Sequence, residues 1–140
     1  MDLQVLTIAI ADDHTLFRKG VLEILKAYKE ITVIADASNG AELIEKIEAS
    51  ALPDIIILDL EMPEMDGIVT SRYIISKYPE VKILIVSMYG EESLVEKLLK
   101  EGVHGYLLKS AEPEELRDAL QTLKGGNCFF SQTIKNFMPY

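Results

Sequence analysis

The 140-residue chain lacks several features, and each absence excludes a class of protein. Its one cysteine, Cys128, excludes a disulfide framework and a cysteine-based zinc site, and we expect this thiol to be a buried or half-buried bystander. No apolar run approaches the length that crosses a bilayer, so no membrane partner is expected. The N-terminus has no signal-peptide pattern, which favours a cytoplasmic location.

Basic residues are also scarce. The chain has 14 Lys and Arg against 23 Asp and Glu, a net charge of −9. An acidic domain repels nucleic acid, so we expect DNA contact only through a domain outside these residues. With 49% hydrophobic and 26% charged residues, the composition is that of a folded globular domain.

Short apolar segments alternate with amphipathic helical segments along the chain. The expected strands are 5–11, 32–37, 53–58, 81–86 and 103–108, and the expected helices are 15–28, 40–50, 67–77, 91–100 and 113–124. This alternation predicts an α/β fold with a doubly wound, five-stranded parallel sheet and five helices on both faces. We assign residues 1–126 to one domain and 127–140 to a linker or C-terminal extension.

The first of these helices has apolar residues that we expect on its buried face and charged residues that we expect outward. The buried set is Leu16, Val21, Ile24 and Leu25, and the outward set is Arg18, Lys19, Glu23 and Lys26. In the loop before the third helix, Asp66 is expected to be a helix cap rather than a metal ligand.

Acidic residues follow two of the predicted strands. Asp12 and Asp13 come directly after the first strand, and Asp59 comes directly after the third. If both strands are neighbours in a parallel sheet, three carboxylates converge at one edge. Such a cluster repels itself unless a cation binds or one member is protonated. The sequence therefore predicts a site for a hard divalent cation.

Two further polar residues follow the fourth and fifth predicted strands. Ser87 comes directly after the fourth and Lys109 directly after the fifth. Ligands of open parallel sheets bind at the carboxyl ends of the strands, so these side chains should join the acids. The set suits transfer of a phosphoryl group to a carboxylate, with one aspartate as nucleophile and with Lys109 and Ser87 holding phosphoryl oxygens.

Taken in order, these motifs resemble the receiver domain of two-component response regulators over about residues 5–124. The matching segments are 12–13, 59–67, Ser87 and 105–109. Within the family, the segments 11–20 and 106–109 look more like receivers that carry a C-terminal LuxR-type helix-turn-helix output domain than like other receivers. The resemblance implies the flavodoxin-like receiver fold with strand order 2-1-3-4-5. It also implies that the chain is either the regulatory half of a transcription regulator or a stand-alone receiver.

The resemblance assigns the acidic residues. Asp59 is the expected phosphoacceptor, charged by a sensor histidine kinase. Asp13 is the expected direct Mg²⁺ ligand, with Asp12 assisting and with Asp59 and the backbone carbonyl of Glu61 completing the metal site; Mn²⁺ can substitute. Lys109 is expected to pair with the phosphoryl group.

The resemblance also implies a switch. Ser87 is expected to move toward the phosphoryl oxygens, and Tyr106 then turns inward into the vacated space. A partner reads the altered face, and homodimerisation on phosphorylation is one form that this reading can take.

Two other functions remain open from the residues. A Mg²⁺-dependent phosphohydrolase would use the same acids. Such enzymes usually have a cap over the substrate, and the chain has no insertion large enough to form one. We therefore expect no enzyme activity beyond the domain's own phosphorylation and dephosphorylation. A nucleotide or flavin binder is disfavoured because the turn at 12–14 is Asp-Asp-His, without a glycine-rich phosphate loop. Neither His14 nor His104 has a second ligand at metal spacing, so both are expected to be solvated or hydrogen-bonded.

Overall fold

The structure is a computed structural model that describes residues 5–88 and 90–131. Its strands are β1 (Leu6–Ala11), β2 (Ile31–Ala37), β3 (Ile55–Leu58), β4 (Lys82–Ser87), β5 (Gly105–Leu108) and β6 (Phe129–Phe130), and its helices are α1 (Thr15–Lys26), α2 (Gly40–Ala49), α3 (Gly67–Lys77), α4 (Glu92–Glu101) and α5 (Pro113–Lys124). Every strand and helix expected from the sequence is present, with small differences at the ends.

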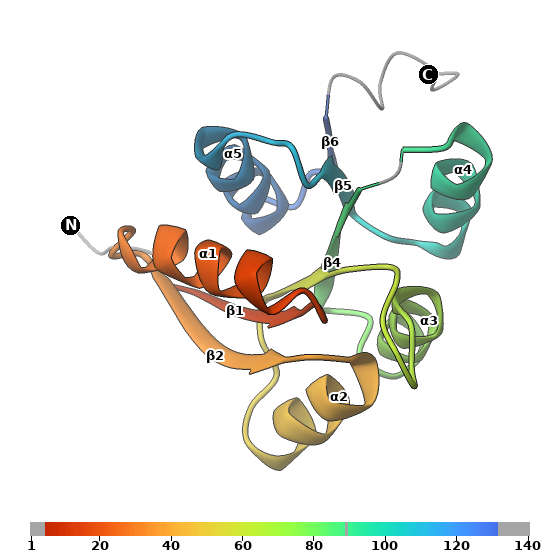
Figure 1. Ribbon diagram of the computed structural model, residues 1–140, viewed down its shortest axis with the longest axis horizontal. Coiled ribbons are helices and arrows are strands. Elements are labelled where there is room, and N and C mark those ends of the chain that lie inside the picture. The colour runs from red at the N-terminus through yellow and green to blue at the C-terminus, as the bar shows by residue number, and fades with distance from the viewer. Residues whose placement is uncertain (1–4, 89, 132–140) are drawn as a thin grey trace.

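The strands form one parallel sheet in the order β2-β1-β3-β4-β5-β6. Helices α1 and α5 cover one face, and α2, α3 and α4 cover the other (Figure 1). The predicted doubly wound fold and the order 2-1-3-4-5 are therefore confirmed. Within the described residues, no helix has both the length and the hydropathy required to span a membrane.

The sixth strand was not expected, because it lies in the segment assigned to a linker. Phe129 and Phe130 pair with Gly105 and Tyr106, and the Ser131 N–H donates to the Tyr106 carbonyl at 3.1 Å. Phe130 is buried in the core beside Tyr106, which gives this short segment a packing reason to join the sheet. The other part of that segment, residues 132–140, lies outside the described residues.

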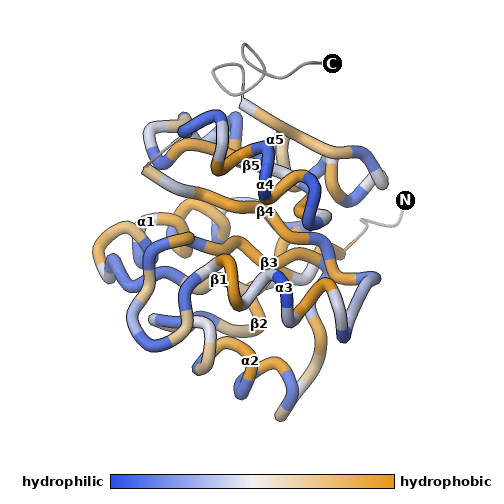
Figure 2. Tube along the Cα trace, turned by 90° about the vertical axis from the view of Figure 1, so that its right-hand side faces the viewer, coloured by the Kyte–Doolittle hydropathy of each residue, from blue (hydrophilic) through white to orange (hydrophobic). Residues whose placement is uncertain are grey.

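The sheet separates two apolar layers. All four residues of β3 are buried, as expected for a central strand covered on both faces, and the central strands are the apolar centre of the molecule in Figure 2. One layer packs against α2, α3 and α4 through Leu43, Ile47, Ile74, Val95 and Leu98, and the other packs against α1 and α5 through Val21, Leu25, Leu116, Leu120 and Leu123.

The predicted faces of α1 were wrong at two positions. Leu16 is 88% exposed, because it lies out of phase with Val21 and Leu25, and Phe17 contributes to the buried face instead. The Arg18 side chain, expected outward, is only 14% exposed. Hydrophobicity alone therefore misplaced the first turn of α1, where the helix borders a polar edge of the sheet.

Candidate functional site

The sheet register brings the acidic residues together. Ala11 and Leu58, the last residues of β1 and β3, are register partners, and the Asp59 N–H donates to the Ala11 carbonyl at 3.0 Å. The hydrogen bonding between β1 and β3 thus continues one residue beyond the strand ends. Asp12 and Asp59 therefore lie side by side at the edge of the sheet. Both side chains are almost fully buried, with residue exposures of 2% and 3%.

A glycine shapes the loop after Asp59. Gly67 begins α3 and packs so closely on this loop that a Cβ there would lie 2.1 Å from the Asp59 carbonyl oxygen. Its N–H also donates to the Leu60 carbonyl at 2.9 Å, and Asp66 caps the helix by accepting from the Val69 N–H, as expected. Only a residue without a side chain can hold the loop in this position.

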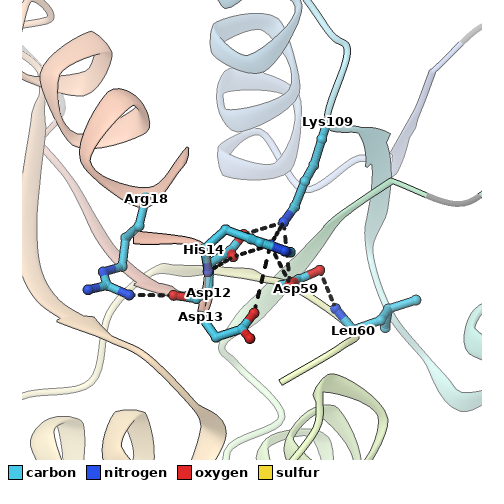
Figure 3. Close-up of polar contacts among 7 residues, drawn as sticks. All are labelled: Asp12, Asp13, His14, Arg18, Asp59, Leu60 and Lys109. Carbon is cyan, nitrogen blue, oxygen red and sulfur yellow. Dashed lines mark hydrogen bonds and ion pairs between the residues drawn. The ribbon is translucent and has the colours of Figure 1, made fainter. Parts of the chain in front are cut away.

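Lys109 supplies positive charge to the two buried acids. Its backbone N–H donates to the Ser87 carbonyl at 2.8 Å, which places the residue just beyond β5. Its Nζ lies 2.9 Å from Asp12 Oδ2 and 3.4 Å from Asp59 Oδ2 (Figure 3). The side chain is 10% exposed, and Nζ also lies 4.7 Å from the centroid of the Phe17 ring.

Burial dominates the protonation of Asp59. Burial, the larger cause, and the neighbouring charge of Asp12 together raise the pKa of this carboxyl, which stands at about 6. The Lys109 ammonium and the Leu60 N–H, which donates to Asp59 Oδ1 at 2.9 Å, lower the pKa but do not cancel these effects. Asp59 is thus a carboxylate whose charge the fold itself disfavours, which is typical of a reactive group.

The ligand set fits a divalent cation. One ligand atom from each of Asp12, Asp13, His14 and Asp59 lies within 4.8 Å of all the others. Three are carboxylate oxygens, the donors that hard cations prefer, and Asp13 stands at the solvent side with a side-chain exposure of 35%. The side-chain cluster does not include Glu61, whose backbone carbonyl stays a predicted ligand.

A comparison of the chain with known protein families identifies its family. Residues 8–121 match the family model of the response regulator receiver domain. The chain belongs to this family. The resemblance found in its motifs is therefore confirmed, and the acidic edge of the sheet lies where the receiver motifs predicted it.

Curated relatives of the receiver are longer than this chain. DegU of Brevibacillus brevis is 39% identical over 127 residues, covering 91% of this chain and 53% of that protein. NarL of Escherichia coli strain K12 is 40% identical over 128 residues, covering 91% of this chain and 59% of that protein. The chain thus spans a little over half the length of these relatives.

Solved structures show the same fold. The receiver domain of RcsB from Salmonella enterica serovar Typhimurium, in the presence of the phosphomimetic BeF₃⁻, has a TM-score of 0.87 and 25% identity, covering 94% of this chain and 97% of that one. A LuxR-family response regulator from Aurantimonas has a TM-score of 0.88 and 28% identity, covering 94% of each chain. The similarity to the LuxR-type subfamily is thereby confirmed.

The two predicted switch residues of the receiver contact each other. Ser87 and Tyr106 are 1% and 0% exposed. Burial raises the pKa of Tyr106, while its side-chain hydrogen bond with Ser87 lowers it. Tyr106 therefore already points inward in this structure. Their switching role stays a prediction.

His14 is half-exposed and hydrogen-bonded, as expected: its Nδ1 lies 2.7 Å from Lys109 Nζ. The same nitrogen lies 3.2 Å from Asp12 Oδ1 and 3.7 Å from both Asp13 Oδ1 and Asp59 Oδ2, an approach that spacing along the chain did not predict, because Asp59 follows another strand.

The expectation for Cys128 was wrong, because this thiol is exposed rather than buried.

Sequence reasoning also missed a residue that supports Asp12. The Arg18 guanidinium donates to the Asp12 backbone carbonyl (Figure 3). Its Nε also lies 3.4 Å from Asp36 Oδ2. This side chain thus joins the carboxyl ends of β1 and β2. A basic residue one helical turn after the paired acids was the available signal.

Proposed function

We propose that this receiver domain is a phosphorylation-controlled switch that accepts a phosphoryl group on Asp59 from a phosphohistidine of a sensor histidine kinase. The observation that carries the proposal is the placement of Asp59: a buried carboxylate at the carboxyl edge of the sheet, with a lysine 3.4 Å from one oxygen. Membership of the receiver family supports the same residue.

In the proposed step, a carboxylate oxygen of Asp59 attacks phosphorus. The new O–P bond forms as the P–N bond to the kinase imidazole breaks, and the bonding electron pair stays on that nitrogen. Asp59 must be ionised to attack, and a pKa of about 6 leaves most of it ionised at neutral pH. Lys109, already beside this carboxylate, pairs with the charge of the transferred group.

Asp12, Asp13 and Asp59 are the side chains that would hold Mg²⁺ or Mn²⁺, with the Glu61 backbone carbonyl as a further ligand. The ion supplies positive charge that offsets the carboxylates and the phosphoryl oxygens. The convergence of these carboxylates supports the assignment, because their mutual repulsion calls for a cation.

The readout proceeds through Ser87 and Tyr106. A phosphoryl group on Asp59 brings strong acceptor oxygens toward the end of β4, and these compete with Tyr106 for the Ser87 hydroxyl. Transfer of the Ser87 hydrogen bond alters the packing around Tyr106 and hence the surface formed by α4, β5 and α5. One or two charge-assisted hydrogen bonds supply a bias of a few kcal/mol, roughly what such a switch requires.

The relatives suggest what the switch controls. DegU is named a transcriptional regulatory protein and NarL a nitrate/nitrite response regulator, and one RcsB structure shows two dimers bound to two DNAs. We extend this to the present chain as the regulatory half of a cytoplasmic transcription regulator, with homodimerisation on phosphorylation and DNA contact through another domain. These names favour the switch over the phosphohydrolase.

Intact mass spectrometry after incubation with acetyl phosphate and Mg²⁺ tests the proposal. The wild type is expected to gain the mass of one phosphoryl group and Asp59→Asn to gain none, while Asp118→Asn, an exposed aspartate of α5, serves as the matched control and behaves as wild type. Labelling of Asp59→Asn at the wild-type level would remove Asp59 from its role. Repeated turnover of an added phosphate ester would favour the hydrolase instead.

A further inference from the structure

We propose that His14 is a nitrogen ligand of the cation site and that it selectively strengthens binding of first-row transition-metal ions such as Co²⁺ over Mg²⁺. The inference rests on the metal site of the proposed function and deepens it. It assigns a specificity-determining role to a residue outside the carboxylates and the Glu61 carbonyl.

The position of the imidazole carries the inference. His14 stands at the N-cap of α1, where a side chain commonly caps the helix, yet it makes no capping hydrogen bond. Its backbone N–H donates instead to Asp12 Oδ1 at 2.8 Å, which turns the residue toward the acids. Nδ1 then lies within 3.7 Å of oxygens from Asp12, Asp13 and Asp59 (Figure 3).

The same ring nitrogen also contacts Lys109. Lys109 Nζ lies 2.7 Å from His14 Nδ1, and an ammonium donates to a nitrogen only through its lone pair. The lone pair of a neutral imidazole is also what binds a metal ion.

The same lone pair cannot serve Lys109 and a metal ion together. Lys109 does not depend on it, because its ammonium also lies 2.9 Å from Asp12 Oδ2 and 3.4 Å from Asp59 Oδ2. The His14 side chain is 52% exposed at the mouth of the site, so it has room to adjust. Coordination by Nδ1 therefore requires only local rearrangement.

The chemistry of the donors gives the selectivity. Mg²⁺ takes oxygen ligands almost entirely and gains little from an imidazole. Co²⁺, Ni²⁺ and Zn²⁺ bind imidazole well and lie above Mn²⁺ in affinity for a mixed nitrogen and oxygen site. A site of three carboxylates and His14 should thus bind these ions more tightly than the carboxylates alone.

Isothermal titration of the purified chain with CoCl₂, and separately with MgCl₂, tests the inference. For His14→Ala we expect Co²⁺ affinity to fall by at least about tenfold, since mutation of even an indirect partner of a metal ligand commonly lowers affinity by about 10- to 100-fold. We expect Mg²⁺ affinity to change by less than about twofold, because this ion gains little from an imidazole. Pulsed EPR of the Mn²⁺-loaded wild type should show coupling to a histidine nitrogen. His14→Ala should lose this coupling even though it retains His104, the other histidine of the chain.

An equal loss of Co²⁺ and Mg²⁺ affinity in His14→Ala, or no loss of either, would overturn the inference. Asp13→Ala separates this failure from failure of the proposed function. If Asp13→Ala weakens both ions while His14→Ala has no selective effect, only the role of His14 is wrong. If Asp13→Ala leaves both affinities intact, the metal site itself is wrong and the inference falls with it.

Discussion

Two carboxylates of this chain, Glu48 and Asp59, are held in opposite ways. Glu48, on the surface of α2, accepts hydrogen bonds from Tyr73 Oη at 2.7 Å, Tyr78 Oη at 2.6 Å and Lys77 Nζ at 2.9 Å. These three donors lower its pKa to about 2. Asp59 is buried beside another acid, and its pKa is raised to about 6.

The difference separates a structural carboxylate from a reactive one. The contacts of Glu48 favour its ionised form and join α2 to the end of α3, so its charge supports the fold. The surroundings of Asp59 disfavour its ionised form, so its charge is available to a cation or a phosphoryl group. Burial, the largest cause of the raised pKa of Asp59, sets the two groups apart, and the neighbouring Asp12 in place of three donors widens the difference.

The two groups affect stability in different pH windows. Because the folded pKa of Glu48 lies below its usual 4.5, its contribution is present above that pH and is lost as pH falls toward about 2. Because the folded pKa of Asp59 lies above its usual 3.8, its contribution is present below that pH and is lost as pH rises through about 6.

The largest effect should come from removing the close packing that holds the Asp59 loop. Gly67→Ala places a Cβ against the Asp59 backbone, and we expect a loss of about 3 kcal/mol or more in the free energy of unfolding, measured by urea denaturation. Gly20→Ala in α1 is the control: nothing lies within 4 Å of its Cβ, so it should gain up to about 1 kcal/mol. Equal effects in both variants would contradict the packing role of Gly67.

Removing the disfavoured charge should stabilise the domain. With a chelator present at pH 7 to 8, Asp59→Asn is expected to raise the free energy of unfolding by on the order of 2 kcal/mol, since one pKa unit corresponds to about 1.4 kcal/mol. The gain should shrink below pH 4, where wild-type Asp59 is protonated in both states. A gain independent of pH would mean that charge is not its cause.

The second cause of the raised pKa can be tested by itself. Asp12→Asn removes the neighbouring charge, so the pKa of Asp59 should fall below about 6 while staying above 3.8, because burial is the larger cause. Carbon-13 NMR titration of the carboxyl in metal-free protein measures it. An unchanged pKa would leave burial as the sole cause.

The smallest effect should come from the exposed carboxylate. Glu48→Gln replaces an ionised acceptor with a neutral one, so the melting temperature should fall modestly at pH 7 and not at pH 2. Glu45→Gln, on the same helix and outside this cluster, should change little. A fall of the same size at both pH values would show that shape, not charge, connects Glu48 to α3.

The fold could be predicted largely from the alternation of segments, because each strand and helix has its own local pattern. The convergence of Asp12 and Asp59 could also be predicted, since parallel strands place their ends at one edge. The sheet order itself came from the resemblance to receivers, because local periodicity does not record which strands become neighbours.

The remaining features depend on contacts between distant segments. His14 lies beside Asp59, which follows another strand. Arg18 turned inward to a backbone carbonyl that no residue pattern reveals. The two-residue strand at Phe129 is too short for any periodicity and exists because β5 offered an open edge. Cys128 stands just before this strand and is exposed.

That placement makes the chain ready for a spectroscopic probe. Cys128 is the single thiol of the chain, and it is exposed. It lies one residue before β6. Just after β6, the Ser131 N–H donates to the Tyr106 carbonyl. A maleimide fluorophore attached there would mark one defined position without any mutation. Its emission would report directly on the main chain beside Tyr106 as phosphate is added or removed.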